Sequence, residues 1–441
     1  MASVTKLKAP KQNLQRRTHP KMCNSIDEFY AIYDEDGFMI GDQDRHRDYH
    51  VKMIVPKTLE DAEIIVSIYE QIYHGTYPYR EMLDSSYIKK SFDNLNYFWG
   101  IFRIDECSPE AGTNVGCFTI VNDLETRTAY FRGLNVLPQF HKKVGVRELA
   151  TSMCVHFLKV TMGRIDKWYI EARTAHNTVQ YISRLAGCKT QALFLNKDYF
   201  LDKKESDCLQ VAYWDRALET SRVVPEFIQP EILPFYYRAL QMHDLLNAKQ
   251  LEIDSIKFDN TNLDYQETFR IITQIRLLTT RDKYGYVSIS IVDPKTSSYL
   301  TALHTESVKN IEKIKYNCSD TSVLIGLFLL LMKYADSHEI EYLEWQVSVS
   351  EGLFCKFLLE QDFKILGYIP AWIPSKNHTG MFEDAVVLAH IKGELEIKNI
   401  QLLPEGHELL DIITMSKLIN QEYLILKDTE EIVNPTKIKI T

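Results

Sequence analysis

The feature that most constrains the fold is an internal similarity between two stretches of the chain that lie 175 positions apart. At this offset residues 164–172 align without gaps with residues 339–347, and Leu149 aligns with Leu324. Few residues are identical, but the expected helices and strands follow in the same order over roughly 60 residues. A repeat of this length is typical of two copies of one fold, and two unrelated α/β domains are the alternative.

The chain has 441 residues, which is more than a single hydrophobic core usually organises. We therefore expect a first domain at residues 48–217 and a second at residues 251–393. A helical connector is expected between them, at residues 218–250. The two ends are expected to form a tail with a packing segment (residues 1–47) and a C-terminal extension (residues 394–441).

The composition excludes several classes of protein. Hydrophobic residues make up 45% and charged residues 25%, as in ordinary globular domains. The net charge of −9 argues against a general nucleic-acid-binding protein. The longest apolar run, Val323 to Met332, has about half the length of a membrane span, so no membrane association is expected. The eight cysteines form no CxxC pair, which predicts neither a metal site nor a disulfide framework and favours a reducing, cytoplasmic compartment.

The start of the chain is basic. Residues 1–22 hold six Lys and Arg residues and no acidic residue. No apolar core of a secretory leader follows. A solvated tail is the simplest interpretation, and an organellar presequence or a nucleic-acid-binding arm is the alternative.

Hydrophobic periodicity predicts the order of elements in both halves. In the first half we expect strands at residues 51–55, 97–104, 115–121, 128–136, 168–172, 192–195 and 209–213, and helices at residues 59–73, 83–92, 144–160 and 178–185. In the second half we expect strands at residues 284–292, 299–305, 343–349, 363–370 and 385–390, and helices at residues 322–335 and 351–360. Consecutive antiparallel strands followed by strand–helix–strand units predict an α/β fold with a mixed, mostly antiparallel sheet and helices on both faces.

The most informative motif is residues 134–149, which are expected to run from a strand through a turn into a helix. This arrangement directs free backbone N–H groups and the positive end of a helix dipole at one point. A pyrophosphate suits such a point, and Lys142, Lys143 and Arg147 add positive charge beside it.

This stretch resembles the acyl-CoA-binding motif of the GNAT (Gcn5-related N-acetyltransferase) superfamily. Val136, Pro138 and Phe140 match the motif in place, and His141 stands at its Arg/Gln position. Val144 and Val146 occupy the positions of its two small residues, with Gly145 between them. The resemblance implies tandem GNAT folds and an acyl-CoA co-substrate, most simply acetyl-CoA. The residues that it implies for CoA binding are Leu134, Asn135, Val136, His141, Lys142, Lys143, Val144, Gly145, Val146 and Asn177.

In that family the strands that match residues 128–136 and 168–172 splay apart around the CoA arm, and an amine attacks the thioester with the help of a base and an acid. The tyrosine that often serves as the acid corresponds to Ser183 here, and Tyr181 lies two residues earlier, about 200° around the helix. Glu171 is a candidate base. The catalytic candidates are therefore Glu171, Ser183 and Tyr181.

Three further polar residues have alternative interpretations. Asp123 and Glu125 are other candidate bases, although these carboxylates, like that of Glu171, also suit a solvated surface. His176 stands where the family often has an asparagine, and it is either a polar residue at a helix start or a catalyst.

The segment that joins the first two helices, residues 74–84, corresponds to the linker that lines the acceptor pocket in GNAT proteins. Its polar and aromatic residues suit an amine-bearing small molecule or peptide, and a packed aromatic loop is the alternative. The residues expected to bind the acceptor are Tyr77, Tyr79, Arg80 and Glu81.

The second copy is expected to be degenerate. Residues 305–320 contain no glycine or proline, and the connection from Thr305 to Leu324 is about six residues longer than the one from Val136 to Leu149. Without a tight N–H cradle, residues 251–393 are expected to be structural and to form an internal pseudo-dimer with the first copy. A homodimer is also conceivable.

Three functions follow from this reading. The first is acyl-CoA-dependent N-acyl transfer, most simply acetyl transfer, to a primary amine. The second is a non-catalytic acyl-CoA-binding or scaffold protein. The third is a tandem fold that binds a protein, or nucleic acid through the basic arm, although nucleic acid is not expected as a general partner.

Overall fold

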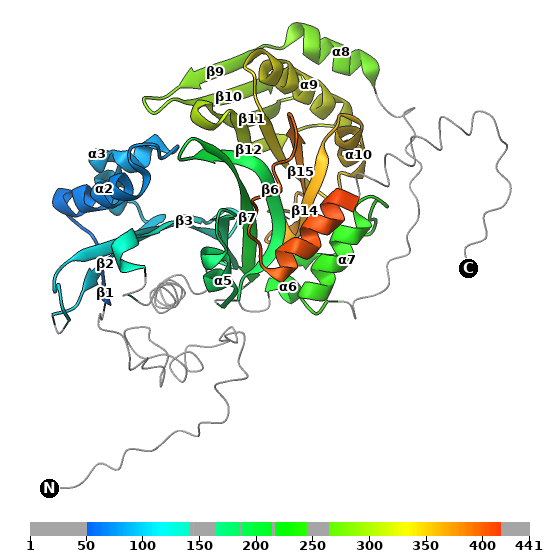
Figure 1. The fold of residues 1–441 in the computed structure, drawn as a ribbon. Coiled ribbons are helices and arrows are strands. Elements are labelled where there is room, and N and C mark those ends of the chain that lie inside the picture. Colours follow the sequence, from blue (N-terminus) through cyan, green and yellow to red (C-terminus); the bar gives the residue numbers. More distant parts are fainter. Residues whose placement is uncertain are drawn as a thin grey trace.

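The computed structural model describes residues 51–106, 108–141, 144, 164–185, 187–213, 217–245 and 264–415. Within these residues the chain builds one mixed sheet of fifteen strands (Figure 1). Nearly all neighbouring strands run antiparallel. The expected fold class, an α/β protein with a mixed and mostly antiparallel sheet, is confirmed.

In the described part of the first half, residues 51–213, two helices precede the central strands and one lies between two of the later strands. Its elements are β1 (Val51–Ile54), α2 (Leu59–Tyr73), η1 (Arg80–Leu83), α3 (Ser85–Phe92), β2 (Tyr97–Ile104), β3 (Asn114–Asp123), β4 (Thr128–Val136), η2 (Pro138–Phe140), β5 (Lys167–Arg173), α5 (Thr178–Leu185), β6 (Lys189–Phe200) and β7 (Lys203–Tyr213). The expected helix at residues 144–160 lies outside the described residues, apart from Val144.

A short connector leads to the second half, residues 264–391. The connector holds α6 (Ala217–Thr220), β8 (Arg222–Val223) and α7 (Leu233–Met242). The second half holds α8 (Tyr265–Gln274), β9 (Leu277–Arg281), β10 (Tyr286–Asp293), β11 (Ser298–Thr305), η4 (Glu306–Val308), β12 (Asn310–Asn317), α9 (Thr321–Ser337), β13 (Tyr342–Ser348), α10 (Gly352–Glu360), β14 (Lys364–Pro374) and β15 (Phe382–Ile391).

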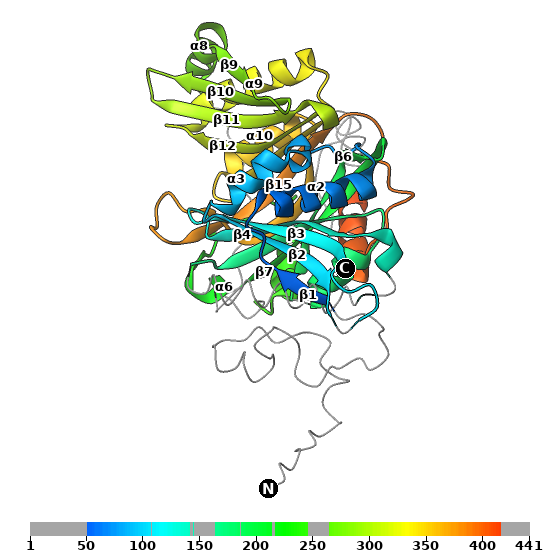
Figure 2. The same ribbon diagram turned by 90° about the vertical axis from the view of Figure 1, so that its left-hand side faces the viewer.

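The two halves have the same strand order. The sheet runs β1-β2-β3-β4-β5-β7-β6 and then β14-β15-β13-β12-β11-β10-β9, so the second half repeats the order of the first in reverse. Each half has one parallel pair at the same place, β4 with β5 and β12 with β13. In Figure 2, strands β9 to β12 of the second half lie above strands β1 to β4 of the first.

The halves meet where β6 pairs with β14. Ala192 and Gly367 are equivalent at the offset of 175, and they lie directly opposite each other. A Cβ atom on Gly367 would lie 2.2 Å from the carbonyl oxygen of Gln191, so only glycine allows this approach. A contact between equivalent residues is what a two-fold axis produces.

A second pair of residues that are 175 positions apart also has similar backbone geometry in the two halves. Asn196 in β6 and Ala371 in β14 both have positive φ, 60° and 48°, and both lie where their strand's register shifts. These bulges bend the end of each strand towards the other half. Lys167 of β5 accordingly reaches the bulge in β14, where its Nζ donates hydrogen bonds of 2.6 and 3.1 Å to the carbonyls of Ala371 and Trp372.

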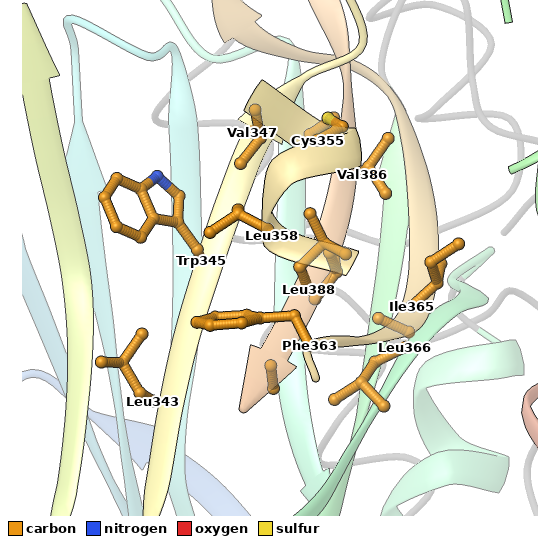
Figure 3. Packing of buried hydrophobic residues seen from close by; sticks show 14 of the residues in the cluster. Leu343, Trp345, Val347, Cys355, Leu358, Phe363, Ile365, Leu366, Val386 and Leu388 are labelled. Carbon is orange, nitrogen blue, oxygen red and sulfur yellow. The ribbon is translucent and has the colours of Figure 1, made fainter. Parts of the chain in front are cut away.

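Two hydrophobic clusters underlie the sheet. One packs α2 against the strands of the first half. The other runs from β6 and β7 through α7 into the second half. In Figure 3, Trp345 and Val347 of β13 and Leu388 of β15 gather around Leu358 of α10 and Phe363. The second cluster spans both halves, so they share a core rather than a polar contact alone.

The structure corrects the interpretation of residues 305–320. They do not form a long connection, because Asn310–Asn317 is strand β12, the counterpart of β4. The comparison of Thr305 with Val136 was therefore wrong, since Thr305 ends the counterpart of β3. The true connection between β12 and α9 is only residues 318–320.

Other boundaries also differ. Strand β6 continues to Phe200 and strand β7 already begins at Lys203, so both strands are much longer than expected. Strand β9 and helix α8 were not expected. Between β9 and β10 there is only a short hairpin, so the described part of the second half lacks counterparts of α2 and α3.

The segment after β15 returns to the first half. Gln401 donates its backbone N–H to the carbonyl of Thr174 at 2.8 Å, and residues 404–415 form a helix beside α7 (Figure 1). Arg238 of α7 donates to the carbonyl of Glu405 at 2.6 Å. Among the helices in the described residues, none has the length and apolarity needed to cross a bilayer.

Candidate active site

The parallel pair β4 and β5 opens at one end. The two strands are paired from Thr128 and Lys167 as far as Phe131 and Ile170, and the recorded pairing stops there. Beyond this point Arg132, Gly133 and Leu134 form one wall of a cleft and residues 171–173 form the other. The opening is at the place where the resemblance to GNAT proteins implied it.

A β-bulge shapes the first wall. Gly133 and Leu134 of β4 both lie opposite the single residue Phe118 of β3. Such a bulge leaves a residue without a ladder partner, which frees backbone groups for other contacts. Gly133 has φ of 63°, and a Cβ atom there would lie 1.9 Å from the hydroxyl oxygen of Tyr69. Glycine is therefore required at the bulge.

The cleft has a volume of about 740 Å³ when it is measured out to its open mouth. Side chains from β4, β5, β6, β7, α5 and the linker after α2 line it. They are Tyr73, Tyr77, Tyr79, Tyr130, Phe131, Arg132, Leu134, Ile170, Glu171, Ala172, Arg173, His176, Val179, Asp198, Phe200 and Asp207, with Gly133 on the wall. Four tyrosines and three carboxylates make it polar and aromatic.

Two buried carboxylates are the most unusual groups in the cleft. Asp198 of β6 and Asp207 of β7 are only 1% and 3% exposed. In the described part of the chain neither forms an ion pair, and Oδ1 of Asp207 has no hydrogen-bond partner. Burial raises the pKa of Asp198 to about 7, and burial with the nearby Asp198 charge raises the pKa of Asp207 well above its usual value. Strongly perturbed groups in a cleft are typical of functional sites.

The two oxygens of Asp198 have partners from different parts of the chain. Tyr79 donates its hydroxyl to Oδ2 at 2.8 Å, and Asn310 of the second half donates its amide to Oδ1 at 3.1 Å. Both bonds favour the ionised carboxylate, while burial favours the neutral form.

The third carboxylate, Glu171 of β5, is paired. Its Oε2 lies 2.8 Å from Nζ of Lys197, which is 1% exposed and also contacts Glu312 and Glu344 of the second half at 3.2 and 3.3 Å. Burial opposes the charge of Lys197, but the three glutamates outweigh it and raise the lysine pKa well above its usual value. Glu171 is thus ion-paired with a buried lysine.

The cationic residues of the cleft also have partners. Arg173 forms a bidentate pair with Glu205, at 2.7 Å for each hydrogen bond. Arg132 reaches Glu81 at 3.3 Å. Burial and the Arg173 charge lower the pKa of His176, which keeps its imidazole neutral at pH 7. Neither arginine therefore neutralises Asp198 or Asp207.

The residues that the sequence suggested for CoA binding are only partly described. Lys142, Lys143, Gly145 and Val146 lie outside the described residues. Leu134 lines the cleft, whereas Val144 is buried. Nε2 of His141 lies 2.7 Å from the carbonyl of Val136, so the ring folds back onto the end of β4.

Two more residues of that group have different surroundings. Asn135 is buried, accepts a hydrogen bond from Tyr73 at 3.2 Å and donates one to the carbonyl of Gly133 at 3.1 Å, so its side chain braces the bulge. Asn177 is exposed just before α5, and its carbonyl accepts from the backbone of Tyr181.

The catalytic candidates on α5 do not line the cleft. Ser183 is buried, and its hydroxyl donates to the carbonyl of Val179 at 2.8 Å and contacts Gln210 of β7. Tyr181 is 43% exposed on the outer surface. Because α5 turns both side chains away from the opening, we do not retain either as the acid; of the three catalytic candidates only Glu171 lines the cleft.

The alternative bases are also remote. Asp123 ends β3, and its Oδ1 accepts backbone N–H groups of Glu125 and Thr126, which is the chemistry of a turn. Glu125 is exposed in that turn, at the end of β4 opposite the cleft.

The four expected acceptor residues separate into two groups. Tyr77 and Tyr79 line the cleft. Arg80 instead donates to the carbonyl of Gly75 at 2.8 Å. Glu81 lies behind the wall, where it contacts Arg132 and accepts a hydrogen bond from Tyr286 of the second half.

Asp198 and Asp207 were missed from the sequence. The predicted strands at residues 192–195 and 209–213 stopped short of both, so neither was considered. An available signal was the placement of Lys197 and Asp198 inside an apolar run that continues to Phe200. Charged residues inside a buried strand are costly, and they often mark a functional site.

In the second half, the equivalent parallel strands β12 and β13 each contribute a glutamate to the buried Lys197 cluster. Strands β12 and β13 pair only from Asn310 and Tyr342 to Ile311 and Leu343, and the next inward residues include Glu312, which binds Lys197. At the start of α9, Asp320 accepts the N–H of Val323 at 3.0 Å. A carboxylate at this helix start would repel a phosphate.

Comparisons with known proteins gave no match to a family model and none to a curated protein. Among solved structures, a spermidine N-acetyltransferase from Vibrio cholerae in complex with CoA and spermine has 10% identity and a TM-score of 0.31, covering 38% of this chain and 96% of that chain. A mutant spermidine/spermine N-acetyltransferase SpeG from Vibrio cholerae has 11% identity and a TM-score of 0.30, covering 37% and 95%. A probable acetyltransferase has 12% identity, a TM-score of 0.30 and coverage of 37% and 93%. These similarities are too weak to assign an activity.

Proposed function

We propose that the chain is an acyl-CoA-dependent N-acyltransferase, most simply an N-acetyltransferase, that acts on a primary amine of a small polar molecule or peptide. The observation that carries this proposal is the pair of buried, unneutralised carboxylates Asp198 and Asp207, which face a cleft opened between two parallel strands. The bulge at Gly133 stands on the opposite wall.

The cleft fits the acyl end of acyl-CoA. Gly133 at positive φ keeps the wall free of a side chain, and the bulge provides backbone N–H groups that can bind a thioester carbonyl. Acyl-CoA supplies the acyl group as an activated thioester when it is bound. Leu134 and Val179 offer apolar surface beside this wall.

The carboxylates suit an amine acceptor. An alkyl ammonium group enters an anionic cleft favourably, and the partnerless Oδ1 of Asp207 can accept one of its hydrogens. The ammonium must lose a proton before it can attack. Asp198, with its pKa raised to about 7, is suited to take that proton near neutral pH. Burial and the Asp198 charge raise the pKa of Asp207 well above its usual value, which favours its protonated form.

The second half is proposed to be structural, and the two halves to be copies of one GNAT-like fold joined as an internal pseudo-dimer. The equal strand orders and the pairing of Ala192 with Gly367 support this proposal. The carboxylate of Asp320 at the start of α9 argues against a second CoA pyrophosphate site.

The first test is calorimetric titration of the full chain with acetyl-CoA. We expect one site per chain, and we expect Gly145→Pro to abolish it. Two sites would contradict the structural role of the second half. An absence of binding would overturn the proposal.

The second test is release of free CoA in the presence of a panel of primary amines. Asp198→Asn should lower kcat/KM by about 10²–10⁴-fold while acetyl-CoA affinity is retained. Asp202→Asn is the matched control, because Asp202 is exposed in the turn that joins the same two strands.

The alternative is a non-catalytic acyl-CoA-binding or scaffold protein. The position of Ser183 and Tyr181 away from the cleft favours it, because α5 then provides no acid. Acetyl-CoA binding without turnover of any amine would support this alternative.

A further inference from the structure

We propose that the second half completes the active site of the first, with Asn310 as a positioning residue that holds Asp198 in its ionised form. This inference rests on the proposed function, since it concerns the residue to which we assign the proton transfer. It gives the second half a role beyond packing.

The contact is specific and buried. Asn310 is fully buried at the start of β12, and its Nδ2 donates to Oδ1 of Asp198 at 3.1 Å. The other oxygen of Asp198 accepts from Tyr79. One carboxylate is therefore held between a tyrosine of the first half and an amide of the second, which fixes its orientation in the cleft.

Packing alone does not account for an asparagine at this position. The amide oxygen of Asn310 is buried and has no hydrogen-bond partner among the described residues. A buried amide with an unsatisfied oxygen costs free energy that an apolar side chain of similar size would avoid. The hydrogen bond from the Asn310 amide to Asp198 is the interaction that offsets this cost.

The second half also sets the charge around Asp198. Burial opposes the charge of Glu312, but Lys313 and Lys197 lower its pKa to about 2, so Glu312 is an anion that raises the pKa of Asp198. The titratable and charged groups that face Asp198 or share its cleft come from both halves. They are Tyr73 of α2, Tyr77 and Tyr79 of the linker, Tyr130 and Arg132 of β4, Glu171 and Arg173 of β5, His176 before α5, Lys197 of β6, Asp207 of β7, Glu312 of β12 and Glu344 of β13.

The segment after β15 fixes the strand that carries Asp198. Asn196, in the bulge two residues earlier, donates its amide to the carbonyl of Glu394 at 2.8 Å and accepts the N–H of Glu396 at 3.0 Å. The second half and the segment that follows it thus hold both the backbone before Asp198 and one of its oxygens.

The inference predicts opposite effects from two substitutions in β12. Asn310→Leu removes a hydrogen-bond donor to the Asp198 carboxylate and so raises its pKa. The acidic limb of the plot of kcat/KM against pH should therefore shift to a pH about one unit higher. Glu312→Gln removes an anion, so the same limb should move down. Tyr199→Phe is the control: it removes a 2.8 Å bond from the tyrosine hydroxyl to Glu341 across the same boundary, and this hydroxyl is not a partner of the Asp198 carboxylate, so the limb should stay in place.

A purely structural role would weaken activity in both variants without opposite shifts of the limb. Shifts in the same direction, or none, would overturn the inference even if turnover is normal. A second readout does not require turnover: carboxyl carbon NMR of protein labelled at aspartate, with the Asp198 signal assigned from Asp198→Asn. The expected opposite pKa shifts without any turnover would retain the positioning role and reject the proposed function. If Asn310→Leu does not fold, Asn310→Ala, which also removes the amide donor to Asp198, takes its place in the comparison with Glu312→Gln.

Discussion

The hydroxyl of Tyr79 donates a 2.8 Å hydrogen bond to Oδ2 of Asp198, and so joins residues that are 119 positions apart. Tyr79 stands in the linker after α2, and Asp198 stands beyond the bulge of β6. Their contact closes the cleft on the side of the linker and links the predicted acceptor segment to the proposed base.

We predict that Tyr79→Phe will shift the pH dependence of turnover. The tyrosine bond lowers the pKa of Asp198, so its loss raises that pKa above about 7 and reduces the ionised fraction at neutral pH. The loss of kcat/KM should be clear at about pH 6.5 and should almost disappear at about pH 8.5. Tyr181→Phe, on the exposed surface, should have no such effect. An equal loss at both pH values would argue against this use of the bond.

Gly133→Ala should destabilise the protein through one identifiable clash. The residue has φ of 63°, and the new Cβ would meet the hydroxyl oxygen of Tyr69, so we expect a loss of at least about 2 kcal/mol in the free energy of unfolding.

The clash with Tyr69 can be separated from the backbone strain. The Tyr69 hydroxyl is buried and has no partner among the described residues, so Tyr69→Phe alone should be almost neutral. In the Tyr69→Phe background, Gly133→Ala should cost about 1 kcal/mol less, as measured by urea unfolding of the parent, both single variants and the double variant. Additive effects would show that the hydroxyl is not the obstacle.

Lys197→Met should be among the most destabilising substitutions in the chain. It leaves three glutamates close together without their buried cation, and breaking such a network costs about 3–5 kcal/mol at pH 7. Burial already raises the pKa of Glu344 above its usual value against the opposing Lys197 charge, so the loss of the lysine raises that pKa further. The folded variant then binds more protons than the unfolded chain, so its deficit should shrink between about pH 7 and about pH 5.

The control is Lys204→Met, which removes a more exposed partner of Glu341. It should cost less than about 1 kcal/mol. If the two variants lose similar stability, the buried cluster is not a special feature.

Asp84→Asn tests the contact between the linker and the β9–β10 hairpin. Lys283 and Tyr284 each hydrogen-bond to Asp84 and lower its pKa to about 2. Asparagine caps α3 as well as aspartate does, so the substitution removes mainly the charge.

The sign follows from the lowered pKa. The stabilisation by Asp84 is present above pH 3.8 and is lost as the pH falls towards 2. The variant should therefore be less stable than the parent at about pH 5–7, by less than about 1 kcal/mol, and the difference should shrink below about pH 4. Asp93→Asn, in an exposed pair within α3, is the comparison. A difference that persists at low pH would contradict the assignment.

The local elements were largely predictable because their causes lie close together in the sequence. The bounds of α2 match the prediction because its apolar residues follow the helical period and Thr58 and Asp61 form a capping box at its start. Strands β2 and β4 and helix α5 also match in full. The likeness of residues 164–172 to residues 339–347 predicted the common order of elements from β5 and β13 onwards, and the predicted fold class is confirmed.

Strand β12 was not predictable in the same way. It alternates lysine and glutamate with isoleucine and tyrosine, and buried Glu312 becomes tolerable only because Lys197 reaches it from the other half. The predicted end of β6 and the predicted start of β7 were wrong for a similar reason, because the charged residues there suggested a loop between two shorter strands. The domain boundaries and the roles of the site residues remain predictions.

By itself the sequence determined many of the local elements, such as α2, β2, β4 and α5, and the common order of elements in the two halves, while the strand–turn–helix CoA site stays a prediction. These features depend on periodicity and on neighbours a few residues away. Only the tertiary structure decided that Asp198 lies between Tyr79 and Asn310, and that Ser183 does not line the cleft. The protonation and direction of a buried polar side chain depend on the groups that folding places around it, and here those groups come from segments more than a hundred residues away.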